Sequence, residues 1–156
     1  MKLSGVSFST EYTDIHTDYA IVIPLLEKTD DVYLLMEVRA EGISQAGDPC
    51  FPGGRIEPGE TPMSAAKREM QEELGICPER MLGQLSPVRT YRGSLVSVYV
   101  CTVAANAADK IHINSSEVAE VLQIPLSFLL AHDNVTEFTF QHHRIWGMSA
   151  RAIRDL

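Results

Sequence analysis

The chain has 156 residues, of which 45% are hydrophobic and 22% are charged, enough for one domain with a substantial core but short for two. Its formal net charge of −8 argues against a nucleic-acid polymer as partner, because phosphate backbones are bound by basic surfaces. A small anionic substrate stays compatible with this charge, since metal ions or a local group of arginines can offset it. We therefore expect a single domain over residues 1–156.

Two features predict a cytoplasmic protein without a membrane partner. The cysteines Cys50, Cys77 and Cys101 are odd in number and far apart, which fits a reducing compartment better than a disulfide framework. The amino-terminal residues lack the apolar run of a signal peptide, and no later segment approaches the length that spans a membrane.

The first predicted elements are two strands joined by a turn. Residues 19–26 and 32–38 are nearly continuous apolar runs, which is typical of strands buried on both faces. Residues 29–31 between them have the composition of a hairpin turn. A polar, glycine-bearing loop over residues 41–49 follows.

A helix is predicted between Thr61 and Gly75. Thr61 suits the N-cap, Pro62 suits the first helical position, and Gly75 stands where the helix would stop. Apolar residues recur between them at helical spacing and form the predicted inward face: Met63, Ala66, Met70 and Leu74.

The rest of the chain mixes strands and helices. In chain order we expect a strand at 85–91 paired with one at 95–103, a short helix at 117–123 capped by Ser115 or Ser116, a helical piece at 126–132, a short edge strand at 136–140 and an amphipathic helix at 145–156. Because the elements do not alternate strictly, we expect an α/β protein with a mixed sheet flanked by helices.

Three glutamates crowd one side of the predicted helix. Glu69, Glu72 and Glu73 stand at positions i, i+3 and i+4, where each like-charged pair costs roughly 0.2–0.5 kcal/mol. We expect them to be exposed on a side that adjoins the apolar face. A solvated helix face explains most such sequences. The alternative is a site for a hard divalent cation, which prefers oxygen ligands.

The residues around the helix favour the cation site. Gly53 and Gly54 permit a close backbone approach and offer carbonyl ligands, and Arg68 can pair with Glu60 in the preceding loop. The whole pattern is Gly54, five residues, Glu60, seven residues and then Arg68-Glu69-Met70-x-Glu72-Glu73-x-Gly75-Ile76. It is similar to the Nudix box at every defined position, so the chain resembles a Nudix hydrolase.

This resemblance implies the Nudix fold, an α/β/α sandwich on a mixed β-sheet in which the box forms a loop–helix–loop. It also implies Mg²⁺- or Mn²⁺-dependent hydrolysis of a diphosphate linked to another group. By position, Glu69 and Glu73 match the principal metal ligands, with Glu72 and the Gly54 carbonyl as further ones. Such ions offset the charge of the diphosphate and activate water, and a glutamate nearby accepts the proton.

Outside the box the chain looks most like the coenzyme A pyrophosphatase branch. Three stretches carry this likeness: Leu34-Leu35 with Arg39 and then Gly47-x-x-x-Phe-Pro-Gly-Gly, residues 116–130, and residues 145–156. The first departs from the branch, since Met36 replaces a threonine, Val38 and Ile43 stand where arginines are expected, and Arg39 is displaced by one position. The candidates for gripping the phosphates are therefore Arg39, Arg55, Arg89 and Arg92.

Several residues keep two interpretations. Glu117 is the first candidate for an extra base or metal ligand and Glu120 the second, unless both are merely exposed residues of a short helix. His142 and His143 fit a structural role better than a catalytic one. Trp146 fits core packing, with contact to an adenine as the alternative.

For the function, the leading hypothesis is cleavage of coenzyme A into 4′-phosphopantetheine and 3′,5′-ADP. The first alternative is hydrolysis of ADP-ribose, another nucleoside diphosphate derivative or a damaged nucleotide. The second is a Nudix-fold sensor that binds nucleotides without cleaving them, although such proteins often lose the box carboxylates that are present here. Because related enzymes often pair, the resemblance also predicts a homodimer.

Overall fold

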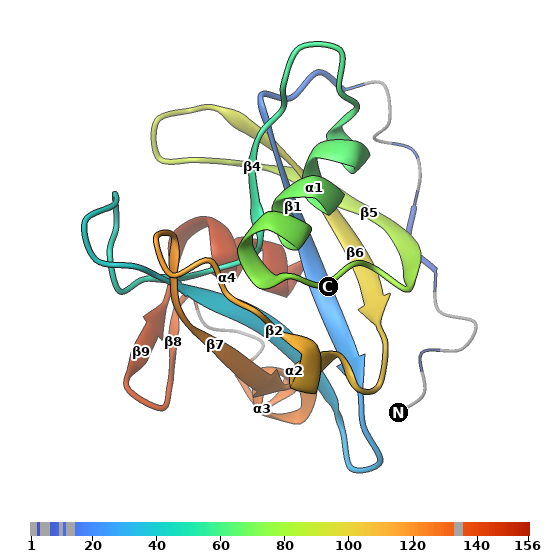
Figure 1. The fold of residues 1–156 in the computed structure, drawn as a ribbon, viewed down its shortest axis with the longest axis vertical. Helices are drawn as coiled ribbons and strands as arrows, with labels where there is room; N and C mark the ends of the chain where they lie inside the picture. The colour runs from blue at the N-terminus through green and yellow to red at the C-terminus, as the bar shows by residue number, and fades with distance from the viewer. Residues whose placement is uncertain (1–2, 4–6, 10, 12–14, 133–135) are drawn as a thin grey trace.

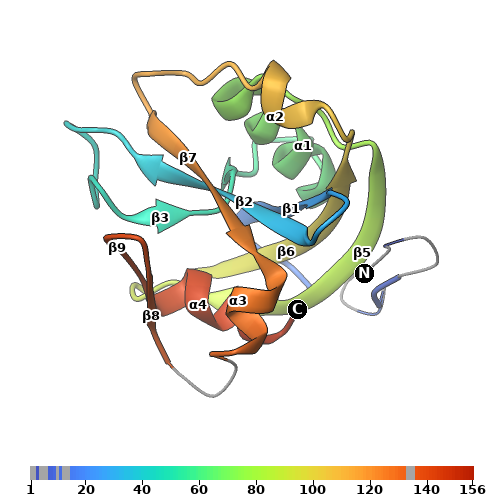
Figure 2. The same ribbon diagram turned by 90° about the horizontal axis from the view of Figure 1, so that it is seen from below.

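The computed structural model describes residues 3, 7–9, 11, 15–132 and 136–156. A mixed sheet forms its middle layer, with α1 and α2 on one face and α3 and α4 on the other (Figure 1; Figure 2). This is the expected α/β/α sandwich. The strands are β1 (Tyr19–Glu27), β2 (Val32–Arg39), β3 (Pro49–Cys50), β4 (Gly53–Arg55), β5 (Arg80–Arg89), β6 (Leu95–Val103), β7 (Val118–Pro125), β8 (Phe138–Phe140) and β9 (His143–Ile145). The helices are α1 (Pro62–Leu74), α2 (Ala107–Lys110), α3 (Leu126–Leu130) and α4 (Gly147–Arg154).

The main sheet has seven strands, with β3-β2-β1-β6-β5 as its path, β4 paired to β1 and β7 paired to β2. Strands β1 and β6 run parallel and the other pairs are antiparallel, so the sheet is mixed as predicted. Strands β8 and β9 form a separate two-stranded sheet. Within the described ranges, no helix has the length and apolar character needed to cross a membrane.

The apolar runs are continuous because both faces of the sheet are covered. Alternate residues of each strand enter different cores. On the α1 side the core contains Ala20, Val22 and Leu26 of β1 with Ala66, Met70 and Leu74 of α1. On the other side it contains Ile21, Ile23 and Leu25 of β1 with Leu129, Ile145, Ala150 and Ala152.

The termini of α1 confirm the predicted helix boundaries. The Thr61 hydroxyl accepts a hydrogen bond from the Ser64 amide at 3.2 Å, and Gly75 adopts a left-handed φ of 69°. The predicted inward face is wrong at one position, because Met63 is 37% exposed in the first turn. Ala65 is buried in its place.

Three predictions for the second half of the chain are wrong or too broad. Residues 118–125 form strand β7 rather than a helix, because they pair along β2 and bury Val118, Leu122 and Ile124 beneath the neighbouring layers. The predicted edge strand at 136–140 is shorter than expected, because only residues 138–140 form β8. This strand belongs to the separate hairpin and not to the main sheet. The last helix is shorter than expected, since residues 143–145 belong to β9.

The two methionines of α1 provide a test of this packing. Met70→Ala removes a fully buried side chain and should lower the free energy of unfolding by about 2–5 kcal/mol. Met63→Ala truncates a partly exposed side chain and should change it by no more than about 0.5 kcal/mol. Chemical denaturation of both variants checks the difference, and equal losses would contradict the observed orientation of α1.

Candidate active site

The loop before α1 lies directly against the helix carboxylates. The Gly53 amide donates a hydrogen bond to Glu73 Oε2 at 3.1 Å. A Cβ atom at Gly54 would overlap the Glu69 carboxylate, and one at Gly53 would overlap the backbone of Ala20 and Ile21. Position 53 therefore requires glycine so that the loop can approach β1, whereas a side chain at Gly54 would displace the Glu69 carboxylate.

Arg68 fixes the loop to the helix, as the sequence indicated. Its guanidinium donates to both oxygens of Glu60, at 2.8 and 3.0 Å, and to the Arg55 carbonyl at 3.1 Å. It also reaches Glu69 at 2.9 Å and Glu72 at 3.2 Å. These hydrogen bonds hold the pKa of the Glu60 carboxyl below its usual value.

Three of the predicted carboxylates come together. Glu69, Glu73 and Glu117 each place one oxygen within 4.8 Å of the others, with Glu117 contributed by the segment just before β7. Glu72 lies outside this group, pairs with Arg68 and is 53% exposed. The expectation that all three helix glutamates are exposed is wrong, because Glu73 is only 6% exposed between α1 and the sheet.

A fourth carboxylate, Glu37 of β2, was missed by the sequence analysis. It is 3% exposed and lies beside Glu73, on the side of the sheet that α1 covers. Its Oε1 accepts a hydrogen bond from the Cys50 thiol at 3.6 Å, whereas its Oε2 is buried without a hydrogen-bond partner. The only signal in the sequence is a charged residue inside an otherwise apolar strand.

Burial raises the pKa of the Glu37, Glu69 and Glu73 carboxyls. For Glu73 the neighbouring Glu37 carboxylate adds to the rise, and for Glu69 the Arg68 guanidinium opposes it. The ionised forms of these side chains therefore need a positive charge, which Arg68 supplies beside Glu69 and Arg39 supplies near Glu37.

A hard divalent cation fits this donor set. Every candidate ligand is an oxygen, the carboxylates converge, and the unpartnered Glu37 oxygen lies buried beside them. A cation would stabilise the ionised carboxyls and offset the desolvation that raises their pKa values.

A pocket of about 560 Å³ lies near Glu37, because Cys50 in its wall is hydrogen-bonded to that carboxylate. Tyr19 lines it and pairs in the sheet with Arg55, the residue after Gly54. Cys50 also lines the pocket, and its thiol donates a hydrogen bond to Glu37. The pocket therefore adjoins the carboxylate group across β1 and β3 rather than containing it.

Two of the four predicted phosphate-binding arginines line this pocket. They are Arg39, whose Nε donates to the Ser44 carbonyl at 2.6 Å, and Arg92, whose Nε donates to the Tyr91 hydroxyl at 2.8 Å. Arg89 donates to the Gly93 carbonyl and Arg55 packs over the Tyr19 ring, and neither lines the pocket.

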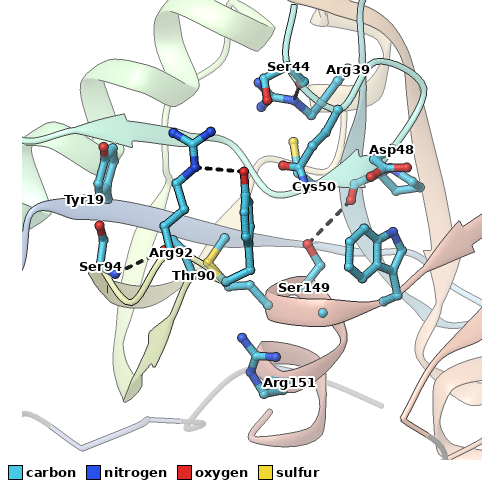
Figure 3. A pocket seen from close by; sticks show the side chains of 16 residues that line it. Tyr19, Arg39, Ser44, Asp48, Cys50, Thr90, Arg92, Ser94, Ser149 and Arg151 are labelled. Carbon is cyan, nitrogen blue, oxygen red and sulfur yellow. Dashed lines mark hydrogen bonds between the residues drawn. The ribbon is translucent and has the colours of Figure 1, made fainter.

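A third pocket arginine, Arg151 of α4, was not predicted. It lies across the pocket from Arg39 and donates to the Arg89 carbonyl (Figure 3). In the part of the chain that the structure describes, no ion pair joins Arg39, Arg92 or Arg151 to a carboxylate. The three guanidinium groups are thus available to an anionic ligand.

Aromatic side chains complete the pocket wall. Tyr91 is 74% exposed, and Trp146, at the start of α4, is 37% exposed. The prediction that Trp146 packs in the core is wrong, because it precedes the first turn of α4 and stacks under Arg144 instead. Both rings offer an apolar surface to a bound ligand.

A group of carboxylate oxygens that suits a hard cation and a pocket lined by arginines are compatible with hydrolysis of a phosphoanhydride. The family model for the NUDIX domain matches residues 16–142. The chain therefore belongs to the Nudix family, and it is a Nudix pyrophosphohydrolase.

Similar proteins agree with this assignment. The chain is 30% identical to an uncharacterized Nudix hydrolase, NudL, of Photorhabdus laumondii, over 92% of this chain and 85% of that protein. It is 32% identical to the peroxisomal coenzyme A diphosphatase of Mus musculus, over 83% of this chain but only 56% of that longer protein.

Solved structures show the same fold at low sequence identity. A C. elegans Ap4A hydrolase matches with a TM-score of 0.59 and 17% identity, over 72% of this chain and 83% of that one. The NUDIX domain of NrtR from Shewanella oneidensis, complexed with ADP ribose, matches with a TM-score of 0.60 and 18% identity, over 83% and 84%.

The raised carboxyl pKa values predict a pH dependence of stability. In chelator-treated protein, the folded state keeps protons on Glu37 and Glu73 that the unfolded chain releases above its glutamate pKa near 4.5. The free energy of unfolding should therefore fall as the pH rises from about 5 to about 8. Glu73→Gln should flatten this slope, and denaturation at several pH values measures it. Identical slopes for both proteins would contradict the assignment.

A second variant tests the connection between loop and helix. Arg68→Ala leaves Glu60 and Glu69 without their shared partner, so it should lower both the melting temperature and the catalytic rate. The matched control is Arg154→Ala, at the end of α4 and away from the loop, which should change neither quantity measurably. A normal rate and melting temperature for Arg68→Ala would show that the loop is placed by other contacts.

Proposed function

We propose that the protein is a Mg²⁺- or Mn²⁺-dependent diphosphatase that cleaves coenzyme A, or a close derivative, into 3′,5′-ADP and 4′-phosphopantetheine. The observation that carries this proposal is a carboxylate group linked through Glu37 and Cys50 to a pocket that three arginines line. In the described part of the chain, none of these arginines forms an ion pair with a carboxylate. The likeness to the mouse coenzyme A diphosphatase supports the choice of substrate.

The carboxylate group would hold the cations. Glu69 and Glu73 serve as the principal ligands, with the Gly54 carbonyl beside Glu69 and with Glu72 at the exposed edge. When bound, the divalent ions supply positive charge that offsets the diphosphate and promotes attack by water. Glu37, from strand β2 of the sheet, contacts Glu73 and adds a further carboxylate beside the group.

Glu117 is the candidate for the general base. Its carboxylate is within 4.8 Å of the Glu69 and Glu73 oxygens, yet its residue is exposed and comes from a different segment. A side chain placed at the edge of the group can accept a proton from water without being a tight ligand. Glu120, the second candidate from the sequence, belongs to a different group of side chains and is not proposed for this role.

The pocket would hold the rest of the substrate. Arg39 and Arg92 line this pocket and would bind phosphate oxygens, and Arg151 lines it from α4 and would do the same. Tyr91 and Trp146 offer flat surfaces for an adenine ring or for the apolar parts of a pantetheine arm.

The main alternative is another nucleoside diphosphate derivative, such as ADP-ribose. It is favoured by the departures from the branch signature, since Val38 is buried in the core and Ile43 cannot bind phosphate. We further propose a cytoplasmic location, in line with three free cysteines, while a homodimer stays a prediction from the family.

A substrate panel tests the proposal. With Mg²⁺ or Mn²⁺, coenzyme A should be hydrolysed more efficiently than ADP-ribose or other nucleoside diphosphate derivatives, as judged by kcat/KM from product detection. Turnover of ADP-ribose with indifference to coenzyme A would reverse the order of the two candidates.

The role of Glu73 has its own test. Glu73→Gln keeps an acceptor for the Gly53 amide and replaces a carboxyl whose raised pKa destabilises the metal-free fold at neutral pH, so the melting temperature of the metal-free protein should be unchanged or slightly higher. Its kcat should fall by about 100-fold or more, because a charge that holds the cations is lost. Glu79→Gln, an exposed glutamate beyond α1, is the control and should retain full activity. Unchanged turnover in Glu73→Gln would refute its role as a ligand.

A further inference from the structure

A second group of possible metal ligands lies outside the candidate active site. One atom each of Glu120, His142 and His143 lies within 4.8 Å of the other two. Glu120 comes from β7 in the main sheet, whereas both histidines come from the tip of the separate β8–β9 hairpin. The group thus joins segments that share no strand pairing.

The backbone at the hairpin tip brings the two histidines together. Phe140 pairs with His143, so Gln141 and His142 form a two-residue turn, and Gln141 adopts a left-handed φ of 55°. Adjacent residues of a strand normally point to opposite sides, but here the two imidazole rings stack with centroids 4.1 Å apart. The positive φ of Gln141 is the backbone conformation that such a hairpin turn uses at its first position.

The side chains already face one another. His143 Nε2 lies 2.5 Å from Glu120 Oε1, and the His143 side chain is 9% exposed whereas that of Glu120 is 50% exposed. Glu120 and His142 are exposed and can adjust their rotamers. Tetrahedral bonds of about 2.1 Å place donor atoms roughly 3.4 Å apart, which small side-chain movements achieve from the present separations.

We propose that Glu120, His142 and His143 bind a transition-metal ion of the Zn²⁺ class. Two imidazole nitrogens and one carboxylate oxygen suit Zn²⁺, Co²⁺ or Ni²⁺, unlike the all-oxygen group formed by Glu69, Glu73 and Glu117. Three protein ligands leave one tetrahedral position for water. The site is chemically distinct from the one that holds Mg²⁺ or Mn²⁺.

Such an ion would tie the hairpin to the main sheet. A two-stranded sheet is marginally stable by itself, and the Glu120–His143 contact is the hydrogen bond that links β9 to β7 in the described structure. Trp146 follows β9 directly and lines the pocket. An occupied site would therefore fix one wall of the pocket from outside the catalytic group.

The test measures Zn²⁺ binding to chelator-treated protein in excess Mg²⁺, which fills the all-oxygen site. Calorimetry should give one Zn²⁺ per chain and a higher melting temperature, and Co²⁺ should give the visible absorption of a tetrahedral site. His142→Ala removes one exposed ligand but keeps the Glu120–His143 contact, so it should weaken binding by about tenfold or more.

The matched control is His16→Ala. His16 is a surface histidine, 93% exposed and 3.8 Å from Asp18, with no third ligand in its group among the described residues. The His16→Ala variant should bind Zn²⁺ as tightly as the unmodified protein does. If the unmodified protein and His142→Ala bind Zn²⁺ equally, or neither binds it, Glu120 and His143 form only a hydrogen bond and the proposal is overturned. This result would leave the proposed diphosphatase activity untouched, because that activity depends on Glu69 and Glu73.

Discussion

The candidate active site depends on the close packing of carboxylates between α1 and the sheet. Glu73 and Glu37 are both buried there, the Gly53 amide donates a hydrogen bond to Glu73, and Gly54 lies against the Glu69 carboxylate. Packing like charges in this way raises their pKa values and destabilises the ionised metal-free protein. Arg68 offsets the charge of the neighbouring Glu69 from the exposed side. The remaining charge is the physical reason for a cation at this position.

Much of the fold and of the carboxylate group could be predicted because the signals are local. Caps at Thr61 and Gly75 define α1, and the fixed spacing of the box places Glu69 and Glu73 on the turns that meet the loop. The continuous apolar runs revealed strands buried on both faces, since each face is covered by a layer of helices (Figure 2). Periodicity and capping act over a few residues, and one sequence carries them in full.

The features that could not be predicted depend on contacts between distant segments. Glu37 joins the carboxylate group only because strand β2 brings it against Glu73 of α1. Arg151 joins the pocket only because α4 forms the wall opposite Arg39. Residues 118–125 have helix-compatible composition, but pairing along β2 makes them a strand. The exposure of Trp146 depends on the turn between β9 and α4, and the sequence does not specify that turn. The sequence analysis therefore predicted a buried position on the basis of residue type alone.

The most direct test of the central claim is Mn²⁺ binding followed by the electron paramagnetic resonance signal of the free ion. Chelator-treated protein is titrated with Mn²⁺, alone and with a non-hydrolysable diphosphate analogue. The account predicts that the unmodified protein binds Mn²⁺, that the analogue tightens binding, and that Glu69→Gln with Glu73→Gln abolishes both effects. Equal Mn²⁺ binding by the doubly substituted and unmodified proteins would contradict the assignment of the cation site to α1.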